Sequence, residues 1–407
     1  MTPRTFVLLG GGLAGATAAA TLRDEGFDGR LVLIGAEPLP PYERPPLSKG
    51  YLRGEQSADR IVVRPEKWFA EQEIETRFGE TGSALDLAAG TVALAEADPI
   101  RFDGLLIATG SRAKRPAIPG ADLPGVLDLR TLRDADEIRA VTEPGARAVL
   151  VGMGFIGAEL AASLRSLGVE VTAIEHGKVP LRRAVGPEVG RVIEALHRDH
   201  GVRMHLGRSV EGFLGADRLE AVLLDGDERV DADFAVVGIG AVPNAEVGVD
   251  LGLGVDRGIL ADAELRTIDP RVFVAGDVAS HDHPLFGRIR VEHYDNALRS
   301  AETAARNMLG ARTPFEDVHW FWSDQYDANV QLAGIPAGYD EFVVRGDLDE
   351  RAFAAFYLRE GVMVASVSVN RPRDVRRSMR AIAARVRPDR SRLEDPDFDL
   401  RTLVAKH

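Results

Sequence analysis

Two glycine-rich segments about 140 residues apart carry the residue types of dinucleotide binding: residues 10–15 and residues 152–157. Both read Gly-X-Gly-X-X-Gly, a spacing that lets backbone N–H groups close on a pyrophosphate at a helix N-terminus. An acid follows each segment, Glu37 after 22 residues and Glu175 after 18 residues. Carboxylates at these distances accept hydrogen bonds from ribose hydroxyls. The two segments therefore predict two dinucleotide sites in one chain.

The elements around each glycine segment complete a βαβ unit. A short apolar run precedes the glycines, a helix rich in small residues follows them, and a second apolar run ends at the acid. The predicted units are strand 6–9, helix 16–22 and strand 31–34, then strand 148–151, a helix through Leu167 and strand 169–174. The fold class predicted is α/β with two Rossmann-like dinucleotide-binding domains.

Three further apolar runs end in residues that suit ligand contact. Strand 105–107 leads into Ala108-Thr109-Gly110, strand 234–237 leads into a glycine segment that includes Gly240, and strand 272–274 leads to Asp277. Ligands of open α/β sheets bind outside the carboxyl ends of strands, so Asp277 is a candidate acceptor for hydroxyl groups. The alternative role for Asp277 is an ordinary helix N-cap. A helix is predicted over 296–309, capped around Asp295.

Residues 38–49 are rich in proline and form neither a helix nor a central strand. The segment contains two cations, Arg44 and Lys49, and Ser48 is placed to cap a short helix. It is either a stiff loop facing a ligand or a solvated loop with ordinary surface charges.

Composition narrows the class of protein. The 407 residues have 45% hydrophobic and 28% charged residues and a net charge of −13, which argues against nucleic-acid binding. No apolar run approaches a membrane span, and the strand at Phe6 leaves no room for a signal peptide, so we expect no membrane partner. Cysteine is absent, which excludes disulfides, thiolate nucleophiles and Cys-held metal clusters and fits a cytoplasmic protein.

The last ninety residues differ in character from the rest. Residues 320–327 are aromatic, β-type alternation follows, and a basic helix is predicted over 374–386. Residues 371–392 contain nine arginines and two aspartates, and the cluster is either a docking surface for an acidic partner or a solvated helix and tail. The predicted domains are 1–112 with 245–318, 113–244, and an α+β domain at 319–407.

The residues together resemble a known family. The chain resembles the FAD-dependent, NAD(P)H-linked ferredoxin and rubredoxin reductases, which are putidaredoxin-reductase-like and share the glutathione reductase fold. The resemblance covers essentially the whole chain, and its most specific marks are residues 10–15, 42–49, 108–110, 152–159, 276–277 and 322–325.

The resemblance implies a function. The first domain would hold FAD, the second would hold NADH, and a hydride from NADH would reach FAD before single electrons pass to a small iron–sulfur protein that feeds an oxygenase such as a cytochrome P450. Lys49 and Glu159 would be the catalytic residues, Lys49 near the flavin and Glu159 near both redox rings. The protein would be a monomer or weak dimer.

The resemblance also assigns binding residues. Those for FAD are Gly12, Leu13, Ala14, Gly15, Glu37, Arg44, Lys49, Ala84, Ala108, Thr109, Gly110, Arg130, Asp277, Val278, His293, Tyr294, Ala297 and Trp322. Those for NADH are Gly152, Gly154, Phe155, Ile156, Gly157, Glu159, Glu175, Arg183 and Gly240.

Several alternatives remain open at this point. Related reductases relay electrons through cysteines, a route closed to this chain, so electrons must pass directly to an external acceptor. That acceptor is a ferredoxin or, alternatively, rubredoxin, oxygen or a quinone; a further alternative is a flavin-based redox sensor or interaction protein. Glu175 favours NADH over NADPH, although Lys178, Arg182 and Arg183 lie close in sequence and soften that preference. Two histidine pairs, His197…His200 and His281-Asp-His283, are expected in polar surface turns, and no metal site is predicted.

Overall fold

The computed structural model describes residues 4–94 and 98–404, without the side chains of Ser83 and Ala84. The chain forms two compact units. Unit 1 comprises the residues up to Glu43, Ala58–Arg112 and Val242–Asp317, and unit 2 comprises Arg44–Ser57, Ala113–Ala241 and the residues from Val318 onward. Each unit is described by itself. The proline-rich segment 38–49 is thus divided: residues 38–43 belong to unit 1, and the residues from Arg44 onward belong to unit 2.

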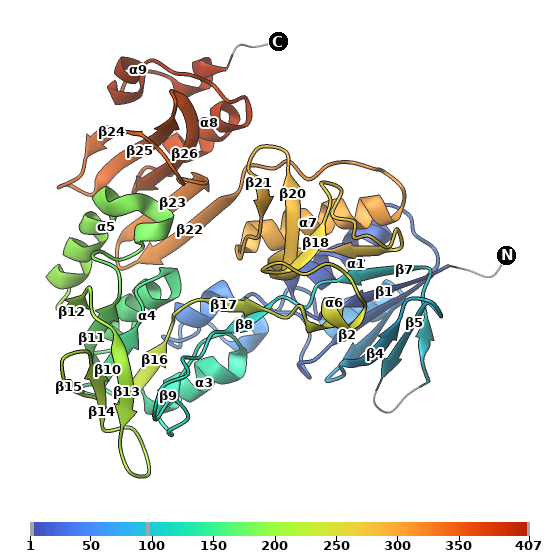
Figure 1. Cartoon of the computed structure of the whole chain (residues 1–407), viewed down its shortest axis with the longest axis horizontal. Coiled ribbons are helices and arrows are strands. Elements are labelled where there is room, and N and C mark those ends of the chain that lie inside the picture. The colour runs from blue at the N-terminus through green and yellow to red at the C-terminus, as the bar shows by residue number, and fades with distance from the viewer. Residues whose placement is uncertain (1–3, 95–97, 405–407) are drawn as a thin grey trace. The chain divides into compact units, whose positions relative to one another are not determined.

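Unit 1 is built on a parallel five-stranded sheet in the order β19-β7-β1-β2-β3. Its strands β1, β2 and β7 are labelled in Figure 1. The central strand β1 lies between β7 and β2, so the chain order reverses there, at the position where doubly wound sheets bind ligands. The strands are β19 (Val272–Val274), β7 (Gly104–Ile107), β1 (Thr5–Leu9), β2 (Arg30–Gly35) and β3 (Ile74–Phe78), and the helices are α1 (Leu13–Asp24), α2 (Glu66–Glu71), α6 (Glu246–Asp250) and α7 (Tyr294–Met308).

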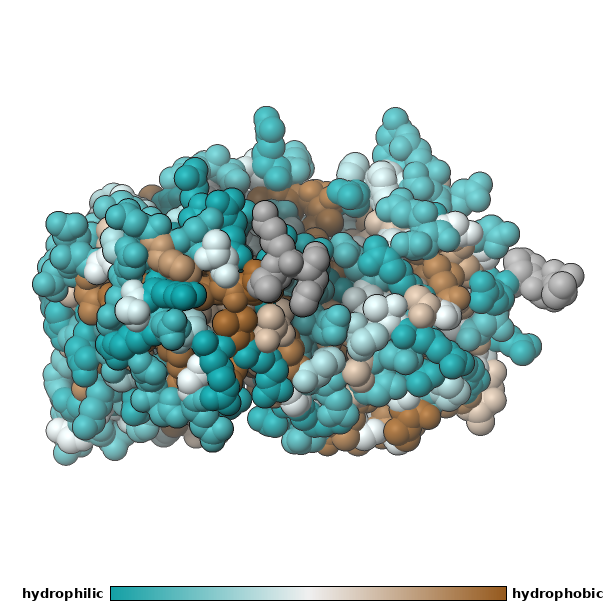
Figure 2. Space-filling model, turned by 90° about the horizontal axis from the view of Figure 1, so that it is seen from above, coloured by the Kyte–Doolittle hydropathy of each residue, from teal (hydrophilic) through white to brown (hydrophobic). Residues whose placement is uncertain are grey.

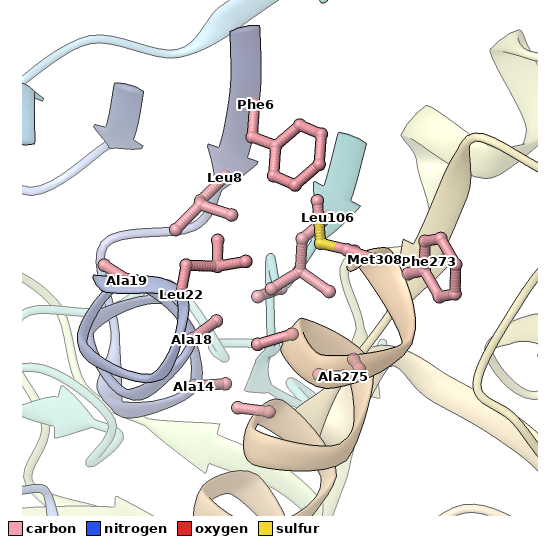
Figure 3. Packing of buried hydrophobic residues seen from close by; sticks show 14 of the residues in the cluster. Phe6, Leu8, Ala14, Ala18, Ala19, Leu22, Leu106, Phe273, Ala275 and Met308 are labelled. Atoms are coloured by element: carbon pink, nitrogen blue, oxygen red, sulfur yellow. The ribbon is translucent and has the colours of Figure 1, made fainter. Parts of the chain in front are cut away.

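Small side chains let two helices of unit 1 pack closely. Ala14 and Ala18 of α1 lie between that helix and α7 in Figure 3, while Leu8, Leu22 and Leu106 fill the space against the sheet. All five are buried. Burial of this apolar surface is the main stabilising contribution, and it fixes the start of α1 directly after β1.

The remaining strands of unit 1 form two small sheets. They are β4 (Gly82–Asp86), β5 (Thr91–Leu94) and β6 (Ile100–Arg101), and β18 (Ile259–Ala261), β20 (Ala279–His283) and β21 (Gly287–Ile289). Two short 3-10 helices, η2 (Ala58–Arg60) and η3 (Gly276–Val278), complete the unit. A two-stranded ribbon of β8 (Ser111–Ala113) and β17 (Ala241–Pro243) spans the residues at which the chain passes from one unit to the other.

Unit 2 repeats the parallel architecture. Its first sheet has the order β12-β11-β10-β16-β9, with β10 between β16 and β11, as β1 lies between β7 and β2. The elements are β9 (Val126–Leu127), α3 (Leu132–Val141), β10 (Arg147–Val151), α4 (Phe155–Ser166), β11 (Glu170–Glu175), α5 (Arg182–Asp199), β12 (Arg203–Leu206), β16 (Phe234–Val237), a hairpin sheet of β13 (Val210–Leu214), β14 (Ala221–Leu224) and β15 (Glu228–Asp231), and η1 (Pro45–Ser48).

The second sheet of unit 2 is antiparallel, in the order β22-β23-β26-β25-β24. Its strands are β22 (Trp320–Gln325), β23 (Ala328–Gly334), β24 (Glu341–Asp347), β25 (Ala352–Arg359) and β26 (Val362–Val369), followed by α8 (Pro372–Ala383), α9 (Arg390–Glu394) and η4 (Leu400–Leu403). The predicted fold class is confirmed: two Rossmann-like sheets and an α+β segment at the end of the chain.

Several helix boundaries differ from the prediction, and α1 covers Leu13–Asp24 instead of 16–22. The helix expected over 296–309 begins at Tyr294, with His293 rather than Asp295 as its N-cap. The basic helix starts at Pro372, because proline suits the first helical turn, and it ends at Ala383. The predicted domain boundaries stay a prediction. Among the helices of the described residues, none is long and apolar enough to cross a membrane. The face shown in Figure 2 is largely hydrophilic.

Candidate functional site

The first glycine turn is shaped by backbone contacts at its ends and is open in its middle. A Cβ on Gly15 would lie 1.9 Å from the carbonyl oxygen of Gly10, so only glycine fits where α1 meets the turn. A Cβ on Gly12 would meet no atom of the described structure within 4 Å. Gly12 is also the N-cap of α1, so the first N–H groups of the helix face that open space. This cradle fits a pyrophosphate.

The second glycine turn repeats this geometry in unit 2. A Cβ on Gly157 would lie 2.1 Å from the carbonyl oxygen of Gly152, whereas a Cβ on Gly154, the N-cap of α4, would have no neighbour within 4 Å among the described atoms. Ile156 is 44% exposed beside this turn, and Ile239, after β16, is 37% exposed. Ile239 was not predicted from the sequence. Exposed apolar side chains beside an open cradle fit the flat rings of a dinucleotide.

The two acids at the strand ends are already oriented by neighbours. Glu37 accepts a hydrogen bond from the hydroxyl of Tyr42 in unit 1. Glu175 accepts hydrogen bonds from the backbone N–H groups of Met153, at 2.7 Å, and Gly177, at 2.6 Å. The Met153 contact ties the acid to the second glycine turn. Each carboxylate has further lone pairs, so it can still accept from ribose hydroxyls.

Asp277 lies in η3, beyond the carboxyl end of β19, and is buried. Its carboxylate accepts a hydrogen bond of 2.7 Å from Ser111. His293 is half-buried close by; the loss of solvent around its ring lowers its pKa to about 4, against the opposing effect of the Asp277 charge. Tyr294 donates to Glu43, and burial together with that carboxylate raises the pKa of Tyr294 to about 12.

The structure brings most of the residues predicted for FAD in unit 1 to one end of the sheet. A Cβ on Gly276, next to Asp277, would lie 3.3 Å from Ala14 and 3.8 Å from Ala297. Thr109 donates to the carbonyl of Asn244, whose side chain donates back to Thr109, holding the turn after β7. The remaining unit 1 residues of the prediction lie in or beside these turns: Leu13 at the start of α1, Ala108 and Gly110 after β7, and Val278 in η3. Ala84 belongs to β4, and its side chain lies outside the described part of the structure.

A second group of predicted residues meets in unit 2. The ammonium of Lys49 lies 2.7 Å from Oε2 of Glu159, and the side chains are only 15% and 6% exposed. Ser48 donates to the same oxygen, and Ser323 of β22 donates to Oε1 at 2.8 Å. The carboxylate of Glu159 thus accepts from three side chains.

The other residues predicted in unit 2 lie apart from this group or at its edge. Arg44 donates to the carbonyl of Arg130. Phe155 packs against Phe321, with ring centroids 4.2 Å apart, and Trp322 stacks with Trp320. Arg183 is exposed in the first turn of α5, and Gly240 is exposed after β16, where its carbonyl accepts from the N–H of Lys114.

The prediction of polar surface turns was wrong for three of the four histidines, whereas His200 is exposed at the C-terminal end of α5, as predicted. His197, His281 and His283 are buried, because each lies on the inward face of α5 or β20 rather than in a surface turn. Burial lowers the pKa of His197 and of His281 to about 4. Within the described ranges, no group of three or more metal-ligating side chains is placed to hold an ion.

Comparison with known proteins places this geometry in a family. Residues 4–306 match the pyridine nucleotide-disulphide oxidoreductase family, and residues 320–404 match the reductase C-terminal family. The chain belongs to the pyridine nucleotide-disulphide oxidoreductases. Within this family it belongs with the putidaredoxin-reductase-like ferredoxin reductases, as the sequence motifs predicted.

Three proteins that are similar to this oxidoreductase support its assignment to the ferredoxin reductases. The ferredoxin–NAD(+) reductase component of the anthranilate 1,2-dioxygenase system of Burkholderia cepacia is 38% identical over 99% of this chain and 100% of its own. The ferredoxin reductase for the CYP199A2 system of Rhodopseudomonas palustris has a TM-score of 0.95 at 35% identity, covering 98% and 100% of the two chains. The reductase in a covalent putidaredoxin reductase–putidaredoxin complex has a TM-score of 0.94 at 33% identity, covering 98% of each chain.

Proposed function

We propose that this protein is an FAD-dependent NADH:ferredoxin oxidoreductase that supplies single electrons to a small iron–sulfur protein serving an oxygenase. The observation that carries the proposal is the duplicated glycine turn. Two parallel sheets each present an open cradle at a helix N-terminus, next to the strand where the chain order reverses. One such cradle fits one dinucleotide, and an enzyme that moves a hydride between two dinucleotides requires two.

When bound, FAD supplies the redox chemistry, accepting a hydride from NADH and releasing electrons one at a time. We propose that the first glycine turn, Glu37 and Asp277 hold FAD, together with the other FAD residues of the sequence prediction. The second glycine turn and Glu175 hold NADH. Phosphates at the open N-termini of α1 and α4 would accept hydrogen bonds from backbone N–H groups and would be stabilised by the positive end of each helix dipole.

Lys49 and Glu159 act on the redox step. Their charges offset each other at 2.7 Å in a largely water-excluded position. Lys49 supplies a positive charge where negative charge develops during hydride transfer, and Glu159 holds that ammonium in one place. This role follows from the family pattern and from the burial of the pair.

The absence of cysteine from the sequence supports direct electron transfer to an external acceptor. Related reductases relay electrons through cysteine residues of the protein. This chain has none to offer, so electrons leave FAD without a protein thiol as carrier. The same absence supports a cytoplasmic location.

The basic helix α8 supports docking of an acidic iron–sulfur protein. Arg373, Arg376 and Arg380 are exposed on α8, and Arg376 lies over the ring of Trp320 at 5.4 Å. Arg371, Arg373 and Arg377 also line a hollow of about 340 Å³ at the start of the helix. In a chain of net charge −13, such a cluster attracts carboxylates and accelerates encounter with an acidic partner.

Anaerobic titration with NADH, followed by addition of a ferredoxin, tests the proposed function. We expect purified yellow protein to bleach at one equivalent of NADH per flavin and to recover its colour as ferredoxin is reduced. Protein that binds no flavin, or flavin that stays oxidised, contradicts the proposal. Recovery with oxygen or a quinone but with no ferredoxin would instead indicate an oxidase or quinone reductase.

A further inference from the structure

A series of buried polar side chains, linked by hydrogen bonds, leads away from Glu159 inside unit 2; we call it the hydrogen-bond chain. Ser323 donates to Glu159 at 2.8 Å, the amide nitrogen of Gln325 lies 3.1 Å from the Ser323 hydroxyl, and Nε2 of His197 lies 3.1 Å from the Gln325 amide oxygen. The hydroxyl of Tyr326 lies 3.3 Å from Nδ1 of His197 and completes the chain. Ser323, Gln325 and His197 have no exposed surface, and Glu159 is 5% exposed.

The position of this hydrogen-bond chain follows from the alternation of side chains along strand β22. Ser323 and Gln325 lie two residues apart, so both point to the same face of the strand, toward α4 and α5. Glu159 is on α4 and His197 is on α5. The hydrogen bonds of β22 to β23 hold the strand, and therefore both side chains, in register.

The chemistry of the groups gives the chain a single direction. A carboxylate only accepts, so the Ser323 hydroxyl must donate to Glu159 and must itself accept from the amide of Gln325. The oxygen of that amide then accepts from Nε2–H of His197, and the bare Nδ1 accepts from Tyr326. This requires neutral His197, in agreement with the burial that lowers its pKa to about 4. Burial also raises the pKa of Tyr326, which keeps it a donor.

We propose that Ser323, Gln325 and His197 are positioning residues for NADH oxidation: their one-directional chain fixes the carboxylate of Glu159 and, through it, the ammonium of Lys49. The inference rests on the proposed function, because it assumes that Glu159 and Lys49 serve the redox step. Ser48 and Lys49 restrain Oε2, and Ser323 restrains Oε1, so the carboxylate is held at both oxygens. Removing the Ser323 hydroxyl takes away the donor to Oε1, so that the carboxylate of Glu159 can rotate about its contacts at Oε2.

The first test compares Ser323→Ala with Ser366→Ala in the holoenzyme. Ser366 is equally buried and lies in β26 of the same sheet. Its hydroxyl forms a hydrogen bond with Ser378, which is not part of the hydrogen-bond chain. We expect Ser323→Ala to lower the limiting rate constant of anaerobic flavin reduction about tenfold, with little change in the Kd of NADH. Ser366→Ala should leave the rate unchanged. Equal rates for Ser323→Ala and the wild type would overturn the proposal.

A double-mutant cycle separates positioning from general damage. If Ser323 acts only through Glu159, adding Ser323→Ala to Glu159→Gln costs little further rate, whereas independent effects would multiply. Multiplied losses overturn the proposal. Thermal unfolding of the four proteins shows whether loss of structure accounts for any difference.

Ring-nitrogen NMR of the histidines supplies a readout that does not depend on turnover. We expect His197, assigned by loss of its signal in His197→Gln, to be neutral at pH 6 with the proton on Nε2. A proton on Nδ1 would reverse the direction of the chain and contradict the inference. Bleaching of the wild-type flavin by NADH tests the proposed function separately, so the two failures are distinguishable.

Discussion

The ammonium of Lys49 lies 2.7 Å from Oε2 of Glu159, although the two residues are 110 positions apart in the sequence. Lys49 lies in the proline-rich loop, directly after η1. Glu159 lies in α4, the helix that follows the second glycine segment. Ser163, one helical turn beyond Glu159, donates to the backbone carbonyl of Ser48 and fastens the loop to α4. The proposed catalytic pair is therefore formed by the packing of a loop on a helix within one unit.

Replacing Lys49 by methionine separates the chemical role of this pair from its structural role. Lys49→Met should lower the rate constant of anaerobic flavin reduction about tenfold or more, because a positive charge at the redox step is lost. It should also lower the free energy of unfolding by about 3 kcal/mol, because the carboxylate of Glu159 stays buried without its ion-pair partner. Stopped-flow absorbance and urea unfolding measure the two effects.

The control is the double variant Lys49→Met/Glu159→Gln. Neutralising Glu159 should restore part of the lost stability but not the rate of flavin reduction. If Lys49→Met reduces flavin as fast as the wild type, the catalytic role of Lys49 is wrong.

Charge reversal on α8 tests the proposed docking of an acidic ferredoxin there. Arg373→Glu/Arg376→Glu should raise the KM for ferredoxin about tenfold at low salt, and the difference should shrink as salt screens the charges. Reduction of ferricyanide should be unchanged. A matched control is Lys67→Glu/Arg133→Glu, which makes the same charge change at side chains that are 84% and 85% exposed elsewhere. Equal loss in both variants would mean that net charge, not this helix, directs the partner.

We expect the preference for NADH over NADPH to depend on Glu175. A carboxylate at this strand end accepts from ribose hydroxyls and repels a 2′-phosphate, so kcat/KM should be higher for NADH than for NADPH. Glu175→Gln keeps an acceptor oxygen for the N–H of Met153 but removes the charge, and we expect it to lower the NADH/NADPH ratio of kcat/KM about tenfold. Glu170→Gln, at the exposed start of the same strand, is the control. An unchanged ratio would place the discrimination elsewhere, with the nearby Arg182 and Arg183 as the next residues to vary.

The local parts of this fold could be predicted from the sequence, and the long-range contacts could not. The βαβ units could be predicted from the apolar runs and from the glycines between them. Some of these glycines, such as Gly15, lie where a Cβ would clash with the backbone. The contact of Ser323 with Glu159 joins residues 164 positions apart, and no pattern near Ser323 distinguishes its hydroxyl from an ordinary buried serine. The burial of His197 was missed for a related reason: the apolar face of α5 is covered by strands of the C-terminal sheet.

Buried histidines predict that stability decreases in mild acid. His197 and His281 each have a pKa lowered to about 4 by burial, against 6.5 for an exposed side chain. Between these values the unfolded chain binds more protons than the folded protein, so the stabilisation is complete above pH 6.5 and is lost as pH falls toward 4. At pH 5 the loss is about 2 kcal/mol for each histidine relative to pH 7.5. Urea unfolding of the wild type at both pH values measures it.

Variants assign this pH effect to particular residues. His197→Gln should remove the contribution of one histidine, about 2 kcal/mol, from the pH dependence of the free energy of unfolding, because glutamine does not titrate. His176→Gln, at an exposed position, should not alter it. A wild-type protein that is as stable at pH 5 as at pH 7.5 would contradict the prediction.

Alanine in the two glycine turns tests which cofactor each one holds. A Cβ at Gly12 or at Gly154 meets no described atom within 4 Å, so alanine at either position should fold normally while its methyl group occupies the space proposed for a pyrophosphate. Gly12→Ala should yield folded protein with little bound flavin, whereas Gly154→Ala should stay yellow and show a KM for NADH raised about tenfold or more. Flavin content, circular dichroism and NADH kinetics measure these outcomes. Gly15→Ala is the contrasting variant, because its Cβ would lie 1.9 Å from the carbonyl oxygen of Gly10, and we expect it to lose the fold itself. If Gly12→Ala retained full flavin and Gly154→Ala lost it, the two sites would be assigned in the opposite order.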